Sequence, residues 1–129
     1  MTDVQSYAAT ARSYDLLDAL PNPIYVWRLM PDGGVYLAYA NAAGYRETQG
    51  RVATHLGCEL RAMYQETDPE IVDLIFQTLA DGEPRRIEHE YHFRSTGKVS
   101  WFRTSYMRTT SDEVVVENED LTERRRHLG

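Results

Sequence analysis

The residues best suited to chemistry in this chain are a glutamate and a histidine in a predicted β-strand. Glu90 and His92 are two residues apart, so in a strand both side chains would point to the same face. A carboxylate beside an imidazole can work as a general acid/base pair. It can also form a self-satisfied ion pair at the rim of a sheet, which is the preferred interpretation because the chain holds no strong catalytic motif.

The other candidate nucleophiles and ligands do not form a site. Cys58 is the single cysteine, which excludes an internal disulfide and a cysteine-built metal centre, and nothing around it favours a thiolate. His55, His89 and His127 lack the spacing of metal ligands, so no metal site is predicted.

Composition limits the partners of the chain. Its 129 residues suit one domain, and 42% hydrophobic with 26% charged residues is a soluble globular composition. The net charge of −6 argues against nucleic acid and anionic membranes as partners. No apolar run approaches the ~20 residues that span a bilayer, and the first residues lack signal-peptide features. A cytoplasmic location is therefore expected.

The first half of the chain predicts one helix, a hairpin and several short helices. Apolar residues three and four positions apart predict a helix over residues 1–20, which Pro21 ends. Strands over residues 24–29 and 35–40 flank a Pro-Asp-Gly-Gly turn and predict an antiparallel hairpin. Residues 41–63 are expected to contain short helices.

The second half predicts one long helix followed by strands. Asp68 stands at the N-cap, Pro69 at the first helical position and Gly82 just after the last turn, with an apolar stripe of helical period between them. Segregated helices and strands indicate an α+β fold with an antiparallel sheet. The three predicted strands span residues 86–94, 99–108 and 113–118.

Four motifs, in this order, resemble the joints of a PAS domain, and the resemblance covers residues 16–126. The motifs are Leu16–Ile24 before the first strand, Asn41-Ala42-Ala43 with Gly57 sixteen residues later, Glu90-Tyr91-His92 followed by Gly97 and Trp101, and Asp120–Arg124 at the exit. Each motif alone is weak, but their order and spacing together identify the chain as PAS-like.

The resemblance implies a five-stranded antiparallel sheet in the order 2-1-5-4-3. Short helices and one long helix would cover one face and enclose a ligand pocket, and an N-terminal helix would lie outside this unit. The expected organisation is a flanking helix over residues 1–20, the PAS-like domain over 21–120 and the start of a signalling helix over 121–129. Asp120 and Thr122 would begin that exit helix, where a carboxylate and a hydroxyl suit the free N–H groups.

Departures from the family argue against two cofactors. Flavin-binding LOV members use a cysteine that attacks the flavin, but Leu60 stands at that position here and Cys58 lies two residues earlier. Members that bind haem through a histidine on the long helix differ as well, since residues 68–79 contain no histidine. The ligand itself is not identified by the sequence.

The resemblance also implies which residues of each strand point to which face of the sheet. On the third strand this is counted back from Gly97, and we call the resulting assignment the family parity. Plain alternation would instead bury Ile87, His89, Tyr91 and Phe93 on the third strand. Family parity, which we adopt, predicts an aromatic outer face that a second subunit or the N-terminal helix would cover; its residues are Tyr7, Tyr25, Trp27, Tyr91, Phe93 and Trp101. The predicted ligand pocket consists of Ile24, Val26, Leu60, Met63, Tyr64, Leu74, Glu90, His92, Phe102, Thr104, Tyr106 and Asn118.

The sequence therefore predicts a sensory module and not an enzyme. It would bind a small molecule or a partner and pass the signal through its terminal helices, as the input part of a histidine kinase or a cyclic-dinucleotide signalling protein. A homodimer and a downstream output domain are expected. Two alternatives stay open: a ligand-free homodimerisation module, and a small α+β isomerase or dehydratase that uses Glu90 and His92.

Overall fold

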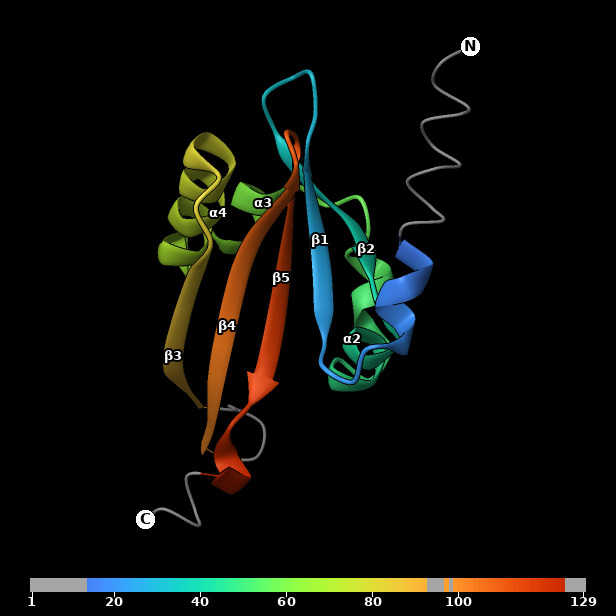
Figure 1. The fold of residues 1–129 in the computed structure, drawn as a ribbon, viewed down its shortest axis with the longest axis vertical. Helices are drawn as coiled ribbons and strands as arrows, with labels where there is room; N and C mark the ends of the chain where they lie inside the picture. The colour runs from blue at the N-terminus through green and yellow to red at the C-terminus, as the bar shows by residue number, and fades with distance from the viewer. Residues whose placement is uncertain (1–13, 93–96, 98, 125–129) are drawn as a thin grey trace.

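The computed structural model describes residues 14–92, 97 and 99–124, which form one antiparallel sheet with helices packed on one face (Figure 1). The strand order is β2-β1-β5-β4-β3, so the predicted α+β fold and sheet topology are confirmed. The strands are β1 (Ile24–Leu29), β2 (Val35–Ala40), β3 (Arg85–His92), β4 (Val99–Thr110) and β5 (Glu113–Asp120). The helices are η1 (Leu16–Ala19), α2 (Ala42–Glu47), η2 (Arg51–Thr54), α3 (Leu60–Tyr64) and α4 (Pro69–Asp81).

The predicted N-terminal helix can be compared with the structure only from Tyr14 onward. Tyr14 and Asp15 are helical and lead into η1, a 3-10 helix in which no residue is buried. Tyr7 and the rest of the predicted helix over residues 1–13 lie outside the described residues.

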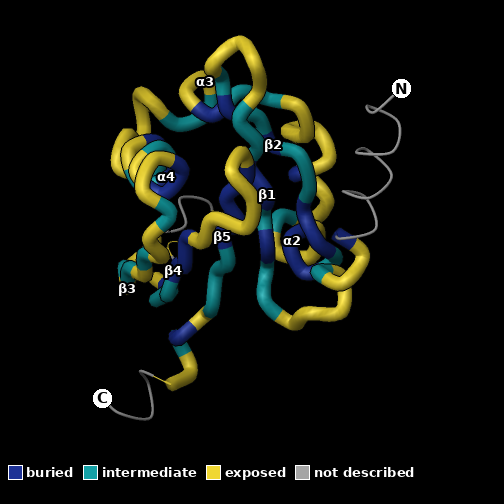
Figure 2. The backbone as a smooth tube through the Cα atoms, turned by 45° about the horizontal axis from the view of Figure 1, so that its top comes forward, coloured by how far each residue is buried: buried dark blue, intermediate teal, exposed yellow. Residues whose placement is uncertain are grey.

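The larger core lies between the sheet and helix α4. The buried residues of α4 face the strands and its exposed residues face away, so the helix is two-sided (Figure 2). Pro69 begins α4 as predicted, whereas the Asp68 side chain makes no capping hydrogen bond. The helix ends at Gly82, which has a φ of +71° and donates its N–H to the Thr78 carbonyl. A side chain at position 82 would also collide with the Arg108 guanidinium, so this turn requires glycine.

A second, smaller core lies on the opposite face of the sheet. It joins β1 and β5 to the end of the N-terminal helix, and Tyr14 stacks on Tyr39 with ring centroids 4.9 Å apart. The buried members of this outer cluster are Tyr14, Ile24, Val26 and Val115. Strand β1 is therefore covered on both faces.

Asn41 joins the first elements of the fold at the point where β2 passes into α2. Its side chain is wholly buried and makes four hydrogen bonds of 2.8–3.0 Å. Its carbonyl oxygen accepts the backbone N–H groups of Ile24 and Gly44, and its amide nitrogen donates to the backbone carbonyls of Leu17 and Asn22. One side chain thus fixes η1, the entry to β1 and the N-terminus of α2 relative to one another.

Replacement of Asn41 by alanine should destabilise the whole domain. Asn41→Ala leaves two buried N–H groups and two carbonyls without this partner, so we expect the free energy of unfolding to fall by about 3 kcal/mol. Urea denaturation would measure the change, with Asn22→Ala as the control because the Asn22 side chain makes a single 3.3 Å bond to Glu117. Equal stabilities of the two variants would contradict the central place of Asn41.

Candidate functional site

The pairing of β3, β4 and β5 decides which side chains face the helices. His89 pairs with Phe102, and Thr104 pairs with Asn118. Tyr106, next on the same face of β4, belongs to the core beneath α4. Because directly opposed residues of antiparallel strands share a face, His89, Thr104 and Asn118 form a polar row on the helix-covered face.

The polar row is a continuous chain of hydrogen bonds. The Thr104 hydroxyl donates to Asn118 Oδ1 over 2.8 Å, and His89 Nε2 lies 2.9 Å from the same hydroxyl oxygen. A hydroxyl has one proton to donate, so His89 must donate to Thr104 through Nε2–H. The geometry therefore places a proton on Nε2 of His89, facing Thr104.

The row ends on a carboxylate of helix α2. Asn118 Nδ2 donates to Glu47 Oε1 over 3.4 Å, and the Tyr25 hydroxyl donates to the same oxygen over 2.6 Å. Every donor along the row points towards Glu47, so the row joins strands β3, β4 and β5 to helix α2. Burial, together with the Glu47 carboxylate, raises the pKa of Tyr25 well above its usual value, so its phenol remains a donor at neutral pH.

Aromatic rings line the face beside the polar row. Tyr64 makes an edge contact with Trp27 at 6.1 Å, and Tyr91 makes an edge contact with Phe102 at 6.4 Å between centroids. Burial raises the pKa of Tyr106 to about 12, with smaller contributions from Tyr64 and Glu70. This face can therefore offer aromatic surface and neutral hydroxyls to a bound molecule.

Eight of the predicted pocket residues lie on this face or on the helices packed against it. They are Leu60, Met63, Tyr64, Leu74, Phe102, Thr104, Tyr106 and Asn118. The sequence prediction missed His89, Glu47 and Tyr25. Plain alternation along the third strand does place His89 on this face, whereas no local signal connects Glu47 with residues 71 positions away in the sequence.

Three predicted pocket residues do not lie on this face, so their prediction was wrong. Ile24 and Val26 belong to the outer cluster with Tyr14. Glu90 pairs with Trp101 on the outer face, so the parity counted back from Gly97 fails there. The side chain of His92, the fourth residue in question, lies outside the described part of the structure.

The predicted outer face also needs correction. Trp27 is buried in the core beneath the helices, Tyr25 lies beside it on the same face, and Tyr91 shares the face of Phe102, although 49% of Tyr91 is exposed. Trp101 lies on the outer face as predicted. Phe93, like Tyr7, is outside the described residues.

The predicted exit residues hold the end of β5 against β4. The Asp120 carboxylate accepts the Thr122 N–H over 2.9 Å, and the Thr122 hydroxyl accepts the Trp101 N–H over 3.0 Å. The Leu121 N–H donates to the Trp101 carbonyl over 2.7 Å, and the Leu121 side chain is buried. We call this arrangement the exit clasp; it lies at the same end of β5 as Asn118.

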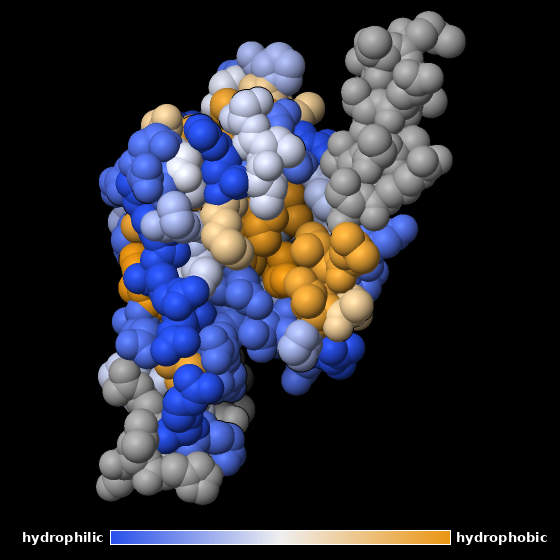
Figure 3. Space-filling view, in the orientation of Figure 1, coloured by the Kyte–Doolittle hydropathy of each residue, from blue (hydrophilic) through white to orange (hydrophobic). Residues whose placement is uncertain are grey.

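The outer face is divided into an apolar and a charged part. Hydrophobic atoms gather where η1, β1 and β2 lie, and hydrophilic atoms cover β3 and β4 (Figure 3). In the apolar part, Leu16 is 75% and Leu20 is 42% exposed. In the charged part, Arg103 lies 3.6 Å from Glu88 and 3.5 Å from Glu119.

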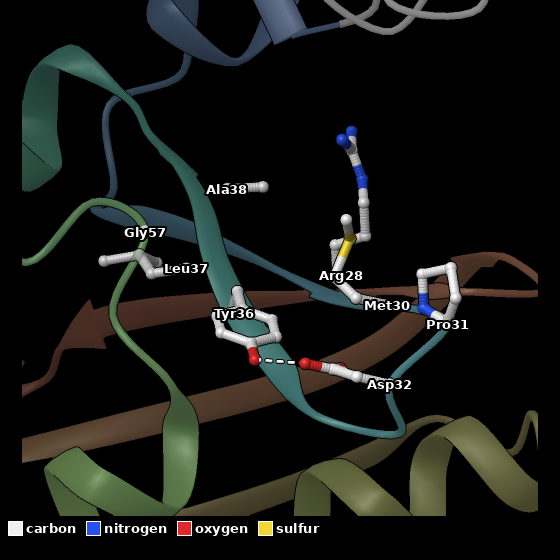
Figure 4. Close-up of a pocket in the computed structure, with 8 residues that line it drawn as sticks. All are labelled: Arg28, Met30, Pro31, Asp32, Tyr36, Leu37, Ala38 and Gly57. Atoms are coloured by element: carbon white, nitrogen blue, oxygen red, sulfur yellow. Dashed lines mark hydrogen bonds between the residues drawn. The ribbon is translucent and has the colours of Figure 1, made fainter. Parts of the chain in front are cut away.

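A depression of about 560 Å³ lies beside the β1–β2 turn on the outer side of the sheet (Figure 4). Met30, Pro31 and Ala38 line it, Arg28 reaches along one side, and Tyr36 donates a hydrogen bond to Asp32 at the other. None of its lining residues belongs to the polar row or to the predicted pocket, so it is a separate feature.

In the part of the chain that the structure describes, no group of three His, Cys, Asp or Glu side chains could hold a metal ion. Within that same part, no helix has the length and apolar character needed to cross a membrane.

An antiparallel sheet in this order, with helices α2 to α4 over one face, defines an α+β fold with one helix-covered face. A family model described as the PAS fold matches residues 17–126, and the chain belongs to this family of sensory domains.

Solved structures share the fold. The PAS domain from Bordetella pertussis BvgS superposes with a TM-score of 0.63 at 19% identity, covering 93% of this chain and 91% of that one. The PAS domain of an HTR-like protein from Haloarcula marismortui gives 0.58 at 20% identity, covering 88% and 98%.

A third structure is much longer than this chain. An RNA-binding light-oxygen-voltage receptor gives a TM-score of 0.59 at 24% identity, covering 97% of this chain, which spans 35% of the receptor's length. These identities show the fold alone. No curated protein matches the sequence.

Removal of the central hydroxyl should break the polar row. Thr104→Val keeps the size of the side chain but deprives both His89 and Asn118 of their partner, so stability should fall by about 1–2 kcal/mol in urea denaturation. The ¹⁵N shifts of His89 should report the Nε2–H tautomer before the change and a mixture of tautomers after it.

The neighbouring Ser105 provides the matched control. Ser105 is also buried but lies on the outer face opposite Glu117, away from the polar row. Ser105→Ala should change the free energy of unfolding by no more than about 0.5 kcal/mol. It should leave the His89 tautomer unchanged. An unaltered His89 tautomer in Thr104→Val would contradict the assigned row.

Proposed function

We propose that this PAS domain binds a small ligand on the helix-covered face and passes the signal through its terminal helices. The polar row carries the proposal, because it crosses from β3 to α2 and includes Asn118, two residues before Asp120 in the exit clasp. A ligand that takes over one hydrogen bond of the row acts on the strand that leads out of the domain.

The mechanism requires two arrangements with different affinities. In the arrangement described here, Asn118 is held by Thr104 on one side and Glu47 on the other. A ligand that pairs with the Asn118 amide must displace one of these partners and shift β5 relative to β4 or α2. The population then moves towards the arrangement that binds the ligand more tightly, and the exit clasp is the first contact affected along the chain.

The output is proposed to be a signalling enzyme downstream, either a histidine kinase or a cyclic-dinucleotide enzyme, in the cytoplasm. One solved structure with this fold is the LOV domain of a blue-light activated histidine kinase from Erythrobacter litoralis, at 17% identity and a TM-score of 0.56. A homodimer is proposed as well, since Leu16 and Leu20 continue the apolar part of the outer face into solvent.

A second candidate function is a ligand-free dimerisation module. Among the described residues, every buried side-chain nitrogen and oxygen has a hydrogen-bond partner. Leu60 and Ile75 are also fully buried beneath the same face. A face that satisfies its own polar groups does not need a ligand for stability.

Native mass spectrometry of freshly purified protein separates the two functions. The ligand-binding function predicts an added small-molecule mass that is lost in Asn118→Leu, which cannot hydrogen-bond a ligand, and retained in Ser105→Ala. The same spectra report whether the chain is a dimer. Bare wild-type chain would support the ligand-free module instead.

Replacement of Asp120 should uncouple the output without unfolding the domain. Asp120→Ala removes the acceptor of the Thr122 N–H, so we expect a stability loss of about 0.5–1 kcal/mol. In a chimera with a kinase output, the response to the domain's signal should disappear. The control is Asp112→Ala, which removes a carboxylate that bonds Thr110 in the turn at the far end of β5. An Asp120→Ala chimera that responds like the parent would overturn the role of the exit clasp.

A further inference from the structure

The depression beside the β1–β2 turn has an apolar side and a charged end. Met30, Pro31 and Ala38 form the apolar side, and Asp32 lies beside Tyr36 at the charged end (Figure 4). The apolar Met30 side chain is 41% exposed. The volume of about 560 Å³ is within the range of pockets that hold small molecules. We call this feature the hairpin depression.

Hydrogen bonds within the turn fix the charged end. Asp32 Oδ1 accepts the Gly34 N–H over 2.8 Å, and Asp32 Oδ2 accepts the Tyr36 hydroxyl over 2.5 Å. The Met30 N–H donates to the Gly34 carbonyl, and the Gly33 N–H donates to the Met30 carbonyl, both over 2.9 Å. The carboxylate is therefore held in one orientation without a ligand.

Gly34 allows the phenol and the carboxylate to meet. A Cβ atom at position 34 would lie 2.9 Å from Tyr36 Cε1 and 3.1 Å from Asp32 Oδ1, which is too close for ordinary contacts. The edge of the Tyr36 ring thus occupies the space that a side chain at position 34 would need. The turn is built around this pair of side chains.

The segment after η2 forms the wall next to β2. The Gly57 N–H donates to the Leu37 carbonyl over 2.8 Å, and the Leu37 N–H donates to the Cys58 carbonyl over 3.0 Å. Around the position that a Cβ of Gly57 would take, no atom of the described residues lies within 4 Å. The wall is therefore attached to the sheet, and the space beside Gly57 stays open.

The charged end favours a cation. Hydrogen bonds from the Tyr36 hydroxyl and the Gly34 N–H lower the pKa of Asp32, so its carboxylate is ionised at neutral pH. Each oxygen keeps a lone pair for a further donor. The bond to Asp32 raises the pKa of Tyr36, to which the charge of Glu59 also contributes, so the phenol stays neutral. Its ring can attract a cation, and the net charge of −6 acts in the same direction.

Arg28 does not oppose a cation at this end. Its guanidinium points away from the Tyr36 and Asp32 side chains (Figure 4). Nη2 of Arg28 lies 2.8 Å from Glu113 Oε2, and Nε donates to the same oxygen over 3.0 Å. The positive charge on the rim is therefore already paired, whereas Asp32 forms no ion pair with another described residue.

We propose that the hairpin depression binds a small organic cation, a protonated amine attached to an aromatic or alkyl body. The ammonium group donates to Asp32 beside the Tyr36 ring, and the apolar body covers Met30 and Ala38. This site lies on the outer side of the sheet, whereas the polar row lies on the helix-covered face. Its test is therefore independent of the proposed function.

Three probes with the same aromatic body test the choice of charge. Phenethylammonium is the cation, 3-phenylpropionate the anion and 2-phenylethanol the neutral molecule, and each is titrated into isotope-labelled protein. Phenethylammonium should bind with a Kd of about 1 mM and shift the NMR signals of the Gly34 amide and the Met30 methyl group. The other two probes should bind about tenfold more weakly, because they lack the charged donor.

Two variants test the two parts of the site. Asp32→Asn removes the charge at an exposed turn position and should weaken phenethylammonium binding about tenfold. Ala38→Leu fills the apolar side and should weaken binding without a change of charge. Asp112→Asn is the control, because it removes a carboxylate of the β4–β5 turn that does not line the depression. It should leave the Kd within about twofold.

The amide spectrum of each variant shows that the fold is intact, and Asp32→Asn and Ala38→Leu act independently of each other. Weaker binding in both variants, with the control unchanged, supports the proposal. Unchanged binding in either variant, equal affinity for the three probes, or an absence of shifts at Gly34 and Met30 would overturn it.

Discussion

The rest of this domain depends on one constraint: each hydrogen-bonding group of the buried Asn41 side-chain amide must have a partner. An amide withdrawn from water must find partners for two donors and an acceptor oxygen, and Asn41 finds all of them in backbone groups from three separate segments. Helix α2 is too short to be stable alone, so this anchor decides where it lies. Glu47, the last residue of α2 and the terminus of the polar row, takes its position from Asn41 at the other end of the helix.

The parts of the fold that follow from local chemistry could be predicted from the sequence. Helix α4 has a proline at its start, a glycine at its end and an apolar stripe of the correct period, and each of these signals acts within a few residues. The hairpin and the long strands follow in the same way. Periodicity alone does not determine the order of strands in the sheet; that order was predicted only by the family resemblance that the motifs at the joints carry, and the structure has it.

The faces of β1 and β3 were mispredicted for two different reasons. Strand β1 places apolar residues on both faces, because both faces are covered. Alternation along the sequence therefore does not show which of these residues face the helices. Only the contact with Tyr14 shows that Ile24 and Val26 lie on the outer face. On β3, Ile87 and His89 alternate with charged residues, and this alternation indicates the correct face. The prediction instead used the parity counted back from Gly97 through the β3–β4 loop, which gave the wrong face. The contact between Glu47 and the strands is a tertiary pairing that sequence spacing does not encode.

The two cores on opposite sides of one sheet have a consequence for how this sequence can change over time. Ile24 and Val26 contribute to one core and Trp27 to the other, while Arg28 is committed to a buried carboxylate. Strand β1 therefore has no neutral position on which substitutions can accumulate, as they do on the solvent-facing side of an ordinary edge strand. Lineages of this domain should keep β1 nearly constant, whereas the charged outer row of β3 can diverge without affecting His89 on the other face.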